Sequence, residues 1–183
     1  MTQEQHLCYD CTHNEKHFEK NYSVLNYDEL SQRMVIDLKY HNCRGYAAFF
    51  GQLIAVRLGK EIRRIDPDYI IPVPVHKSRK RMRGYNQAEL VALELGKILG
   101  IKVLSDGLIR TAHTRAMKEL GHDERLKELQ NAFSIGAQPP DENCVILLDD
   151  IYTTGSTIET CTKILWSEGI KVYSICVCSV PDY

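Results

Sequence analysis

Two adjacent carboxylates and a glycine-containing turn stand together in the last third of the chain. Asp149 and Asp150 follow the apolar run of residues 144–148. Shortly after them comes a turn made of Thr153, Thr154, Gly155, Ser156 and Thr157. If the apolar run is a strand and a helix follows the turn, the N–H groups and hydroxyls of the turn converge at the N-terminus of that helix. Such a terminus carries about half a positive charge and unpaired donors, which together bind phosphate.

The two carboxylates call for a different ligand group, because negative charges beside a phosphate repel it. The O2′ and O3′ hydroxyls of a ribose donate hydrogen bonds to carboxylates, and Mg²⁺ on those hydroxyls offsets the remaining charge. Gly155 lets the backbone approach the phosphate and adopt a positive φ. The acid pair and the turn therefore predict a site for ribose 5-phosphate. The alternative is an Asp pair at a strand end before an ordinary Thr/Ser helix cap, the commoner explanation of shorter fragments of this pattern.

Five cations within seven positions form the sharpest concentration of charge in the chain. They follow the run Pro-Val-Pro-Val and are Lys77, Arg79, Lys80, Arg81 and Arg83. Lys77, Arg79 and Arg83 are candidates for neutralising a diphosphate, and Arg83, expected to open the next helix, is the first choice. Two other interpretations stay open: a solvated loop, and a contact with single-stranded nucleic acid in which Tyr85 stacks on the bases.

Strands that alternate with helices must position these groups. Apolar runs predict strands at residues 69–72, 101–104, 144–148 and 172–177. Helical spacing predicts helices at residues 28–59, divided at Gly45, and at residues 86–100 and 158–166. Ligands of such sheets bind beyond the carboxyl ends of the strands, where the loops after Val73 and Leu148 lie. The predicted fold class is α/β, with a mostly parallel central sheet flanked by helices.

Two of these helices have predicted ends and apolar faces. Asp28 is expected to cap the first helix, which presents Leu30, Met34 and Leu38 on one face. Gly100 is expected to occupy the C′ position of the helix at residues 86–100. The apolar stripe of that helix is predicted to consist of Ala88, Val91, Leu95, Ile98 and Leu99.

Length and composition limit the class of protein. A chain of 183 residues with 44% hydrophobic content builds one sizeable core. The formal net charge of -1 gives no global field toward nucleic acid or membrane, so anions must be recognised by local clusters. The sequence has no apolar run of membrane-spanning length and a polar N-terminus, which predicts a cytoplasmic protein without membrane insertion.

Seven cysteines, an odd number, suit a reducing compartment better than a disulfide framework. Cys8 and Cys11 have the C-x₂-C spacing of a zinc knuckle, although structural zinc needs four ligands. Zn²⁺ is favoured over a redox dithiol, because no thioredoxin-like strand and helix surround the pair. Further ligands could come from His6, His13, His17 and Cys43, whose spacing does not indicate such a site. The cysteines expected to be small core residues are Cys144, Cys161, Cys176 and Cys178.

The run V-I-L-L-D-D-I-Y-T-T-G-S-T, which ends at Thr157, resembles the phosphoribosyl diphosphate (PRPP) binding loop of type I phosphoribosyltransferases. More narrowly, the chain resembles the competence protein F (ComF) family. That resemblance rests on P-V-P-V-H from Pro72, on R-G-Y-N-Q from Arg83, and on Arg125 followed by Ala132-Phe133. It implies a type I phosphoribosyltransferase-like fold, with Asp149 and Asp150 on the ribose and residues 153–157 around the 5′-phosphate.

The resemblance also implies how the chain divides into domains. Residues 1–26 correspond to a partial zinc-knuckle-like segment, and residues 27–183 to the phosphoribosyltransferase-like domain, in which residues 27–65 form a helical hood. Similar proteins carry two C-x₂-C pairs, of which this chain has the second. At two positions the chain departs from the family's pattern, with Met117 in place of a glutamine and Glu128 in place of an asparagine.

The implied reaction is Mg²⁺-dependent transfer of a phosphoribosyl group from PRPP to a small-molecule acceptor, with release of pyrophosphate. In such a reaction the protein mainly positions the reactants and neutralises charge. The sequence indicates neither the acceptor nor a general base. The alternative is a PRPP-binding accessory protein without turnover, which works in competence and DNA uptake with single-stranded DNA and competence-machinery proteins as partners.

Overall fold

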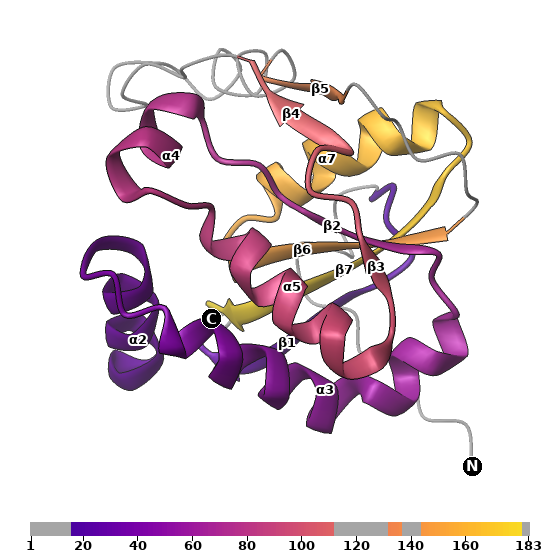
Figure 1. Ribbon diagram of the computed structural model, residues 1–183. Helices are drawn as coiled ribbons and strands as arrows, with labels where there is room; N and C mark the ends of the chain where they lie inside the picture. The colour runs from indigo at the N-terminus through magenta and orange to yellow at the C-terminus, as the bar shows by residue number, and fades with distance from the viewer. Residues whose placement is uncertain (1–15, 112–131, 137–143, 181–183) are drawn as a thin grey trace.

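The computed structural model describes residues 16–111, 132–136 and 144–180. Its centre is a five-stranded sheet of order β1-β7-β6-β2-β3, in which every pair of neighbours is parallel (Figure 1). The strands are β1 Asn21–Asn26, β2 Tyr69–Pro72, β3 Lys102–Val103, β6 Cys144–Tyr152 and β7 Lys171–Ser179. The predicted α/β class with a parallel central sheet flanked by helices is confirmed.

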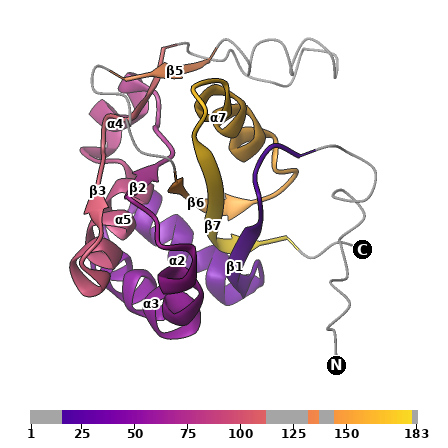
Figure 2. The same ribbon diagram turned by 90° about the vertical axis from the view of Figure 1, so that its right-hand side faces the viewer.

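Helices cover both faces of the sheet, as Figure 2 shows. The helices on one face are α3 Gly45–Ile65 and α5 Gln87–Leu99, and the other face carries α7 Ser156–Ser167. Two further helices, α2 Glu29–Tyr40 and α4 Lys77–Arg83, lie at the end of the sheet where β7 ends (Figure 1). None of the helices in the described parts of the chain has the length and hydropathy needed to span a membrane.

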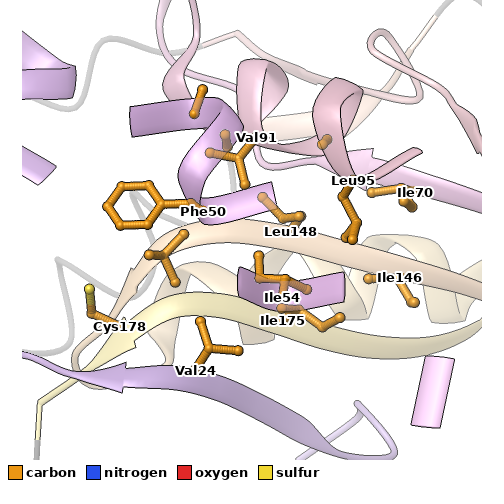
Figure 3. Packing of buried hydrophobic residues seen from close by; sticks show 14 of the residues in the cluster. Val24, Phe50, Ile54, Ile70, Val91, Leu95, Ile146, Leu148, Ile175 and Cys178 are labelled. Atoms are coloured by element: carbon orange, nitrogen blue, oxygen red, sulfur yellow. The ribbon is translucent and has the colours of Figure 1, made fainter. Parts of the chain in front are cut away.

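Both faces of the central strands are apolar because both are covered. Ile70, Ile146, Leu148 and Ile175 pack with Phe50 and Ile54 of α3 and with Val91 and Leu95 of α5 (Figure 3). On the opposite face, Ile71, Val145 and Leu147 pack with Ile158, Cys161 and Leu165 of α7. The alternation of side chains along each strand therefore decides which helix a residue of β6 faces.

The direction of the chain connections reverses between β2 and β6. From β2 the chain passes through α5 to β3, and from β6 it passes through α7 to β7 on the other side. The two strands stay paired to their ends, where the N–H of Val73 donates to the carbonyl of Leu148 at 2.8 Å. In open parallel sheets a ligand crevice lies at such a switch point, beyond the carboxyl ends of the strands. The segments after β2 and β6 therefore flank the expected ligand site.

The helix caps agree with the predictions better than the helix faces do. The Asp28 carboxylate accepts the N–H of Ser31 at 2.8 Å, and the Ser31 hydroxyl accepts the N–H of Asp28 at 2.9 Å, so the N-cap is confirmed. Leu30, however, is 69% exposed, because the buried side of α2 is formed by Ser31, Val35 and Leu38. In α5, Gly100 ends the helix as predicted, with φ +74°, whereas Ile98 is 47% exposed. The predicted apolar faces were therefore wrong at Leu30 and Ile98.

The sequence did not predict β1 or the two strands of a small hairpin. The strand β1 pairs in parallel with β7, so the expected division between residues 26 and 27 does not coincide with the edge of the sheet. A separate antiparallel hairpin joins β4 Leu108–Arg110 to β5 Phe133–Ile135. Strands of three residues are shorter than the four to eight residues that periodicity can detect.

Candidate functional site

The acid pair lies inside the last part of β6 rather than after it. We expected the strand to end near Leu148, but it continues to Tyr152 because its pairing with β7 extends that far. Successive strand residues point to opposite faces, so Asp150 lies on the side of α5 and Asp149 on the side of α7. The two carboxylates therefore have different neighbours.

Asp150 is held by two side chains from outside the sheet. Its Oδ1 accepts a hydrogen bond from Lys39 Nζ of α2 at 2.9 Å, and its Oδ2 accepts one from Gln87 Nε2 of α5 at 2.6 Å. The Asp150 residue is 7% exposed. Burying a carboxylate costs free energy unless a cation and hydrogen bonds compensate for it, and the two donors supply them.

Gln87 connects this carboxylate to α4 and α2. Its Oε1 accepts a hydrogen bond from Arg83 at 3.0 Å, and Arg83 also donates to the hydroxyl of Tyr40 at 3.1 Å. The Arg83 guanidinium lies 4.7 Å from the centre of the Tyr40 ring. Asn86 caps α5 and donates to the carbonyl of Val73 at 2.9 Å, which fixes the start of α5 beside the end of β2.

Asp149 has a weaker set of partners. Its Oδ1 accepts the N–H of Asp150 at 2.8 Å. Burial and the negative charge of Asp150 raise the pKa of Asp149, whereas that backbone hydrogen bond and the charges of Lys39 and Arg110 lower it. Burial also lowers the pKa of Arg110, and the charge of Arg79 lowers it further. A cationic region that includes Arg79 and Arg110 thus lies near the Asp149 carboxyl.

The turn after β6 has the form expected of an anion site. Gly155 is the N-cap of α7 with φ +70° and has no side chain to cap the helix, and the N–H of Ser156 donates to the hydroxyl of Thr154 at 3.4 Å. The hydroxyls of Thr154 and Ser156 lie 2.8 Å apart, and Thr153 and Thr154 are exposed. Helical N–H groups without a side-chain cap are available to a phosphate. A Cβ at Gly155 would lie 2.3 Å from the hydroxyl oxygen of Tyr152, so a larger residue there requires the Tyr152 ring or the turn to shift.

The basic segment is a short helix, α4, and not a loop. Arg83 is its last residue, and Gly84 ends it with φ +81°, so the expectation that Arg83 opens the next helix was wrong. The side chains of Lys77, Arg79 and Arg81 are exposed. Lys80 Nζ lies 3.1 Å from a carboxylate oxygen of Glu89, an ion pair on the surface.

Tyr85 is not available to stack on a nucleic-acid base. Its side chain is 6% exposed, and its hydroxyl donates to the carbonyl of Leu38. The Arg44 guanidinium covers the ring at 4.7 Å from its centre. The proposed stacking role was wrong, because the residue after Gly84 turns inward to join α5 to the end of α2.

We expect Tyr85→Phe to lower the free energy of unfolding by about 1 kcal/mol, the usual value of one hydrogen bond, because the Leu38 carbonyl loses its donor. Urea denaturation measures this change. Tyr40→Phe is the comparison and should lose less stability, because the Tyr40 hydroxyl accepts its hydrogen bond from Arg83, 3.1 Å away, at an exposed position. A Tyr85→Phe variant as stable as the wild type would contradict the buried role.

The expected zinc residues are only partly described. Cys8, Cys11, His6 and His13 lie outside the described residues, as do Arg125, Met117 and Glu128. His17 Nδ1 lies 2.6 Å from Glu159, and Cys43 is exposed. In the described ranges, no group of three His, Cys, Asp or Glu side chains could hold a metal ion. Cys161, Cys176 and Cys178 are buried as predicted, and Cys144 is half-buried.

Lys39 and Arg110 are site residues that sequence reasoning missed. Lys39 is 111 positions from its partner Asp150, and Arg110 belongs to a three-residue strand. Gln87 was noted only as part of a motif. The sequence did contain a partial signal: two adjacent carboxylates near the end of a buried strand require a cation from elsewhere in the chain, although the sequence does not identify it.

The chain is similar to proteins of bacterial competence and DNA use. It is 32% identical over 169 residues to competence protein F of Haemophilus influenzae, covering 90% of this chain and 74% of that protein. It is 32% identical over 113 residues to the DNA utilization protein YhgH of Escherichia coli O6:H1, covering 61% of this chain and about half of that protein, 49%. No protein-family model matches the chain.

Among solved structures, the chain is similar to an adenine phosphoribosyltransferase. The TM-score is 0.45 at 18% identity, over 72% of this chain and 69% of that one.

Proposed function

Because the chain belongs to the competence protein F family, we propose that it binds PRPP with Mg²⁺ at the carboxyl end of β6 and transfers its phosphoribosyl group. One observation carries the proposal. The acid pair lies in the last part of a buried strand, a few residues before a helix N-terminus whose N-cap glycine has a left-handed φ. This arrangement offers carboxylates to a ribose and N–H groups to its 5′-phosphate, side by side.

The charges of the site determine the proposed orientation of PRPP. The 5′-phosphate takes the turn at residues 153–157, where helix N–H groups and hydroxyls donate to its oxygens. The ribose hydroxyls donate to a carboxylate of the acid pair. The diphosphate then reaches the cationic region of Arg79 and Arg110, with Lys77 on the same short helix as Arg79. Forked guanidinium donors suit phosphate oxygens better than a point charge does.

The chain's own residues would act by position and charge. A nucleophile attacks C1′ of the ribose, the bond from C1′ to the diphosphate oxygen breaks, and pyrophosphate leaves with the bonding electron pair. The acid pair positions the ribose, and Lys77, Arg79 and Arg110 stabilise the departing negative charge. Mg²⁺ would be held together with the ligand next to the acid pair, where it would offset the charge that the carboxylates bring.

Turnover is tested by measuring the release of pyrophosphate from PRPP. The purified protein is incubated with Mg²⁺, PRPP and a panel of nucleobases or single-stranded DNA. We expect release with at least one acceptor, and release that the Asp149→Asn variant lacks. Release at the same rate in the variant would exclude this site as the catalyst.

A second function is favoured by the names of the relatives, which refer to competence and DNA utilization. In this function the protein binds PRPP without turnover and assists DNA uptake, with single-stranded DNA and competence-machinery proteins as partners. This function predicts that the protein binds PRPP but releases no pyrophosphate in the same assay. If the exposed cations of α4 follow a DNA backbone, each phosphate contact removed by mutation flattens the salt dependence by about 0.7.

A further inference from the structure

We propose that Arg83 and Gln87 form a positioning relay that, together with Lys39, fixes Asp150, so that Asp149 is the carboxylate left open to the ribose. The inference deepens the proposed function and rests on it for the identity of the ligand. It gives Arg83 a role other than contact with the diphosphate.

The relay has only one arrangement of donors and acceptors. A guanidinium can only donate, so the Gln87 oxygen must face Arg83, at 3.0 Å. The amide nitrogen of Gln87 then has to point the other way, toward Asp150 Oδ2 at 2.6 Å. An ionised carboxylate can only accept, so each hydrogen bond in the series has a fixed direction. Arg83 therefore determines which end of the Gln87 amide meets Asp150.

The second oxygen of Asp150 is also occupied. Lys39 Nζ lies 2.9 Å from Oδ1, with both side chains largely buried. Tyr40, the next residue of α2, accepts a hydrogen bond from Arg83 and stacks against its guanidinium. The last turn of α2 thus holds both ends of the relay, one through Lys39 and one through Tyr40. Both oxygens of Asp150 have protein donors and little exposed surface, which suits a fixed support.

Asp149, unlike Asp150, is partly exposed and has fewer hydrogen-bond partners. It lies on the α7 side of β6, the side of the helix whose N-terminus forms the turn. Its residue is half-buried, and its Oδ1 accepts one backbone N–H. Within the part of the chain that the structure describes, no hydrogen bond to its Oδ2 is found. A ribose whose phosphate sits in the turn would therefore meet Asp149 first.

Arg83 has little capacity left for a diphosphate. Its NH1 and NH2 groups donate to Gln87 and Tyr40, and its Nε is buried. Arg79, on the same helix, is exposed and lies in the region of Arg110. Arg79 is therefore the arginine of α4 that contacts the diphosphate, and Arg83 is the one that belongs to the relay.

Binding of PRPP, ribose 5-phosphate and pyrophosphate to Arg83→Ala and Gln87→Glu separates the two roles. Gln87→Glu keeps the size of the side chain and the acceptor for Arg83, but it removes the donor to Asp150. We expect both variants to lose about ten- to a hundredfold in affinity for PRPP and for ribose 5-phosphate alike, and to keep the wild-type affinity for pyrophosphate. Arg81→Ala, an exposed cation of the same helix, is the matched control and should bind all three ligands normally.

Loss of PRPP and pyrophosphate affinity in Arg83→Ala, with ribose 5-phosphate binding intact, would overturn the relay. A second readout is independent of any ligand. Arg83→Ala and Asp150→Asn are combined in a double-mutant cycle, and their effects on the urea midpoint should be non-additive although the side chains do not touch. Additive effects would overturn the relay whatever the ligands do. A wild-type protein that binds neither PRPP nor ribose 5-phosphate would overturn the proposed function, while the cycle still decides the relay.

Discussion

Replacing Gly155 by alanine is expected to weaken PRPP binding by at least about a hundredfold, which corresponds to losing two charge-assisted hydrogen bonds to the phosphate. The added Cβ would lie 2.3 Å from the hydroxyl oxygen of Tyr152 and 2.6 Å from its ring carbon Cζ, closer than atoms can approach. The residue also has φ +70°, a left-handed conformation. Either the Tyr152 ring or the turn must move to relieve the overlap, and a turn that moves, or that leaves its left-handed φ, no longer directs its N–H groups at one phosphate.

Gly100→Ala is the matched control for this experiment. Gly100 has φ +74°, but a Cβ there would have no heavy atom within 4 Å. Both variants therefore include the left-handed strain of about 1 to 2 kcal/mol, and only Gly155→Ala includes the overlap at the turn. Calorimetry should show normal PRPP affinity in Gly100→Ala. Normal affinity in Gly155→Ala would mean that residues 153–157 do not surround a phosphate.

Replacing Asp149 by asparagine is expected to weaken ligand binding and to stabilise the fold at neutral and alkaline pH. Asparagine cannot accept two ribose hydroxyls as a carboxylate does, so PRPP affinity should fall by about ten- to a hundredfold. The stabilisation arises because the amide has no charge to bury beside Asp150. A gain of about 1 kcal/mol raises the melting temperature by about 2 to 4 °C in a chain of this size.

The pH dependence of this effect has a definite sign. The pKa of Asp149 is raised in the folded protein by burial and by Asp150. Its protonated form is therefore favoured by folding, and the resulting stability is complete below the ordinary aspartate pKa of about 4. That stability is lost as the pH rises through the raised pKa of the folded state. Melting temperatures across pH should thus differ most between wild type and Asp149→Asn at the alkaline end. A difference that grows toward acid pH would contradict this assignment.

The local elements could be predicted from the sequence because their signals lie within a few residues. The apolar run before Asp149 indicated a strand covered on both faces, and β6 is such a strand. Asp28 and Gly100 carried the chemistry of a helix start and a helix end, and both have those positions. The turn at residues 153–157 was found for the same reason, since its five residues are consecutive.

The contacts that complete the site could not be predicted, because they join distant parts of the chain. Gln87 is 63 positions from Asp150, and no local pattern links them. Charge density alone could not assign a role to each cation of α4, of which Arg83 turns inward and Lys80 pairs with Glu89. The burial of Tyr85 could not be predicted either, because it depends on a contact with Leu38 of α2, 47 positions away.

Isothermal titration calorimetry with PRPP in the presence of Mg²⁺ tests most directly whether the end of β6 is a PRPP site. We expect one binding site per chain in the wild type and in Gly100→Ala, and weakened binding in Gly155→Ala and Asp149→Asn. Wild-type protein that releases no heat and binds no PRPP in a parallel equilibrium measurement, or variants that bind it as tightly as the wild type, would contradict the proposed site.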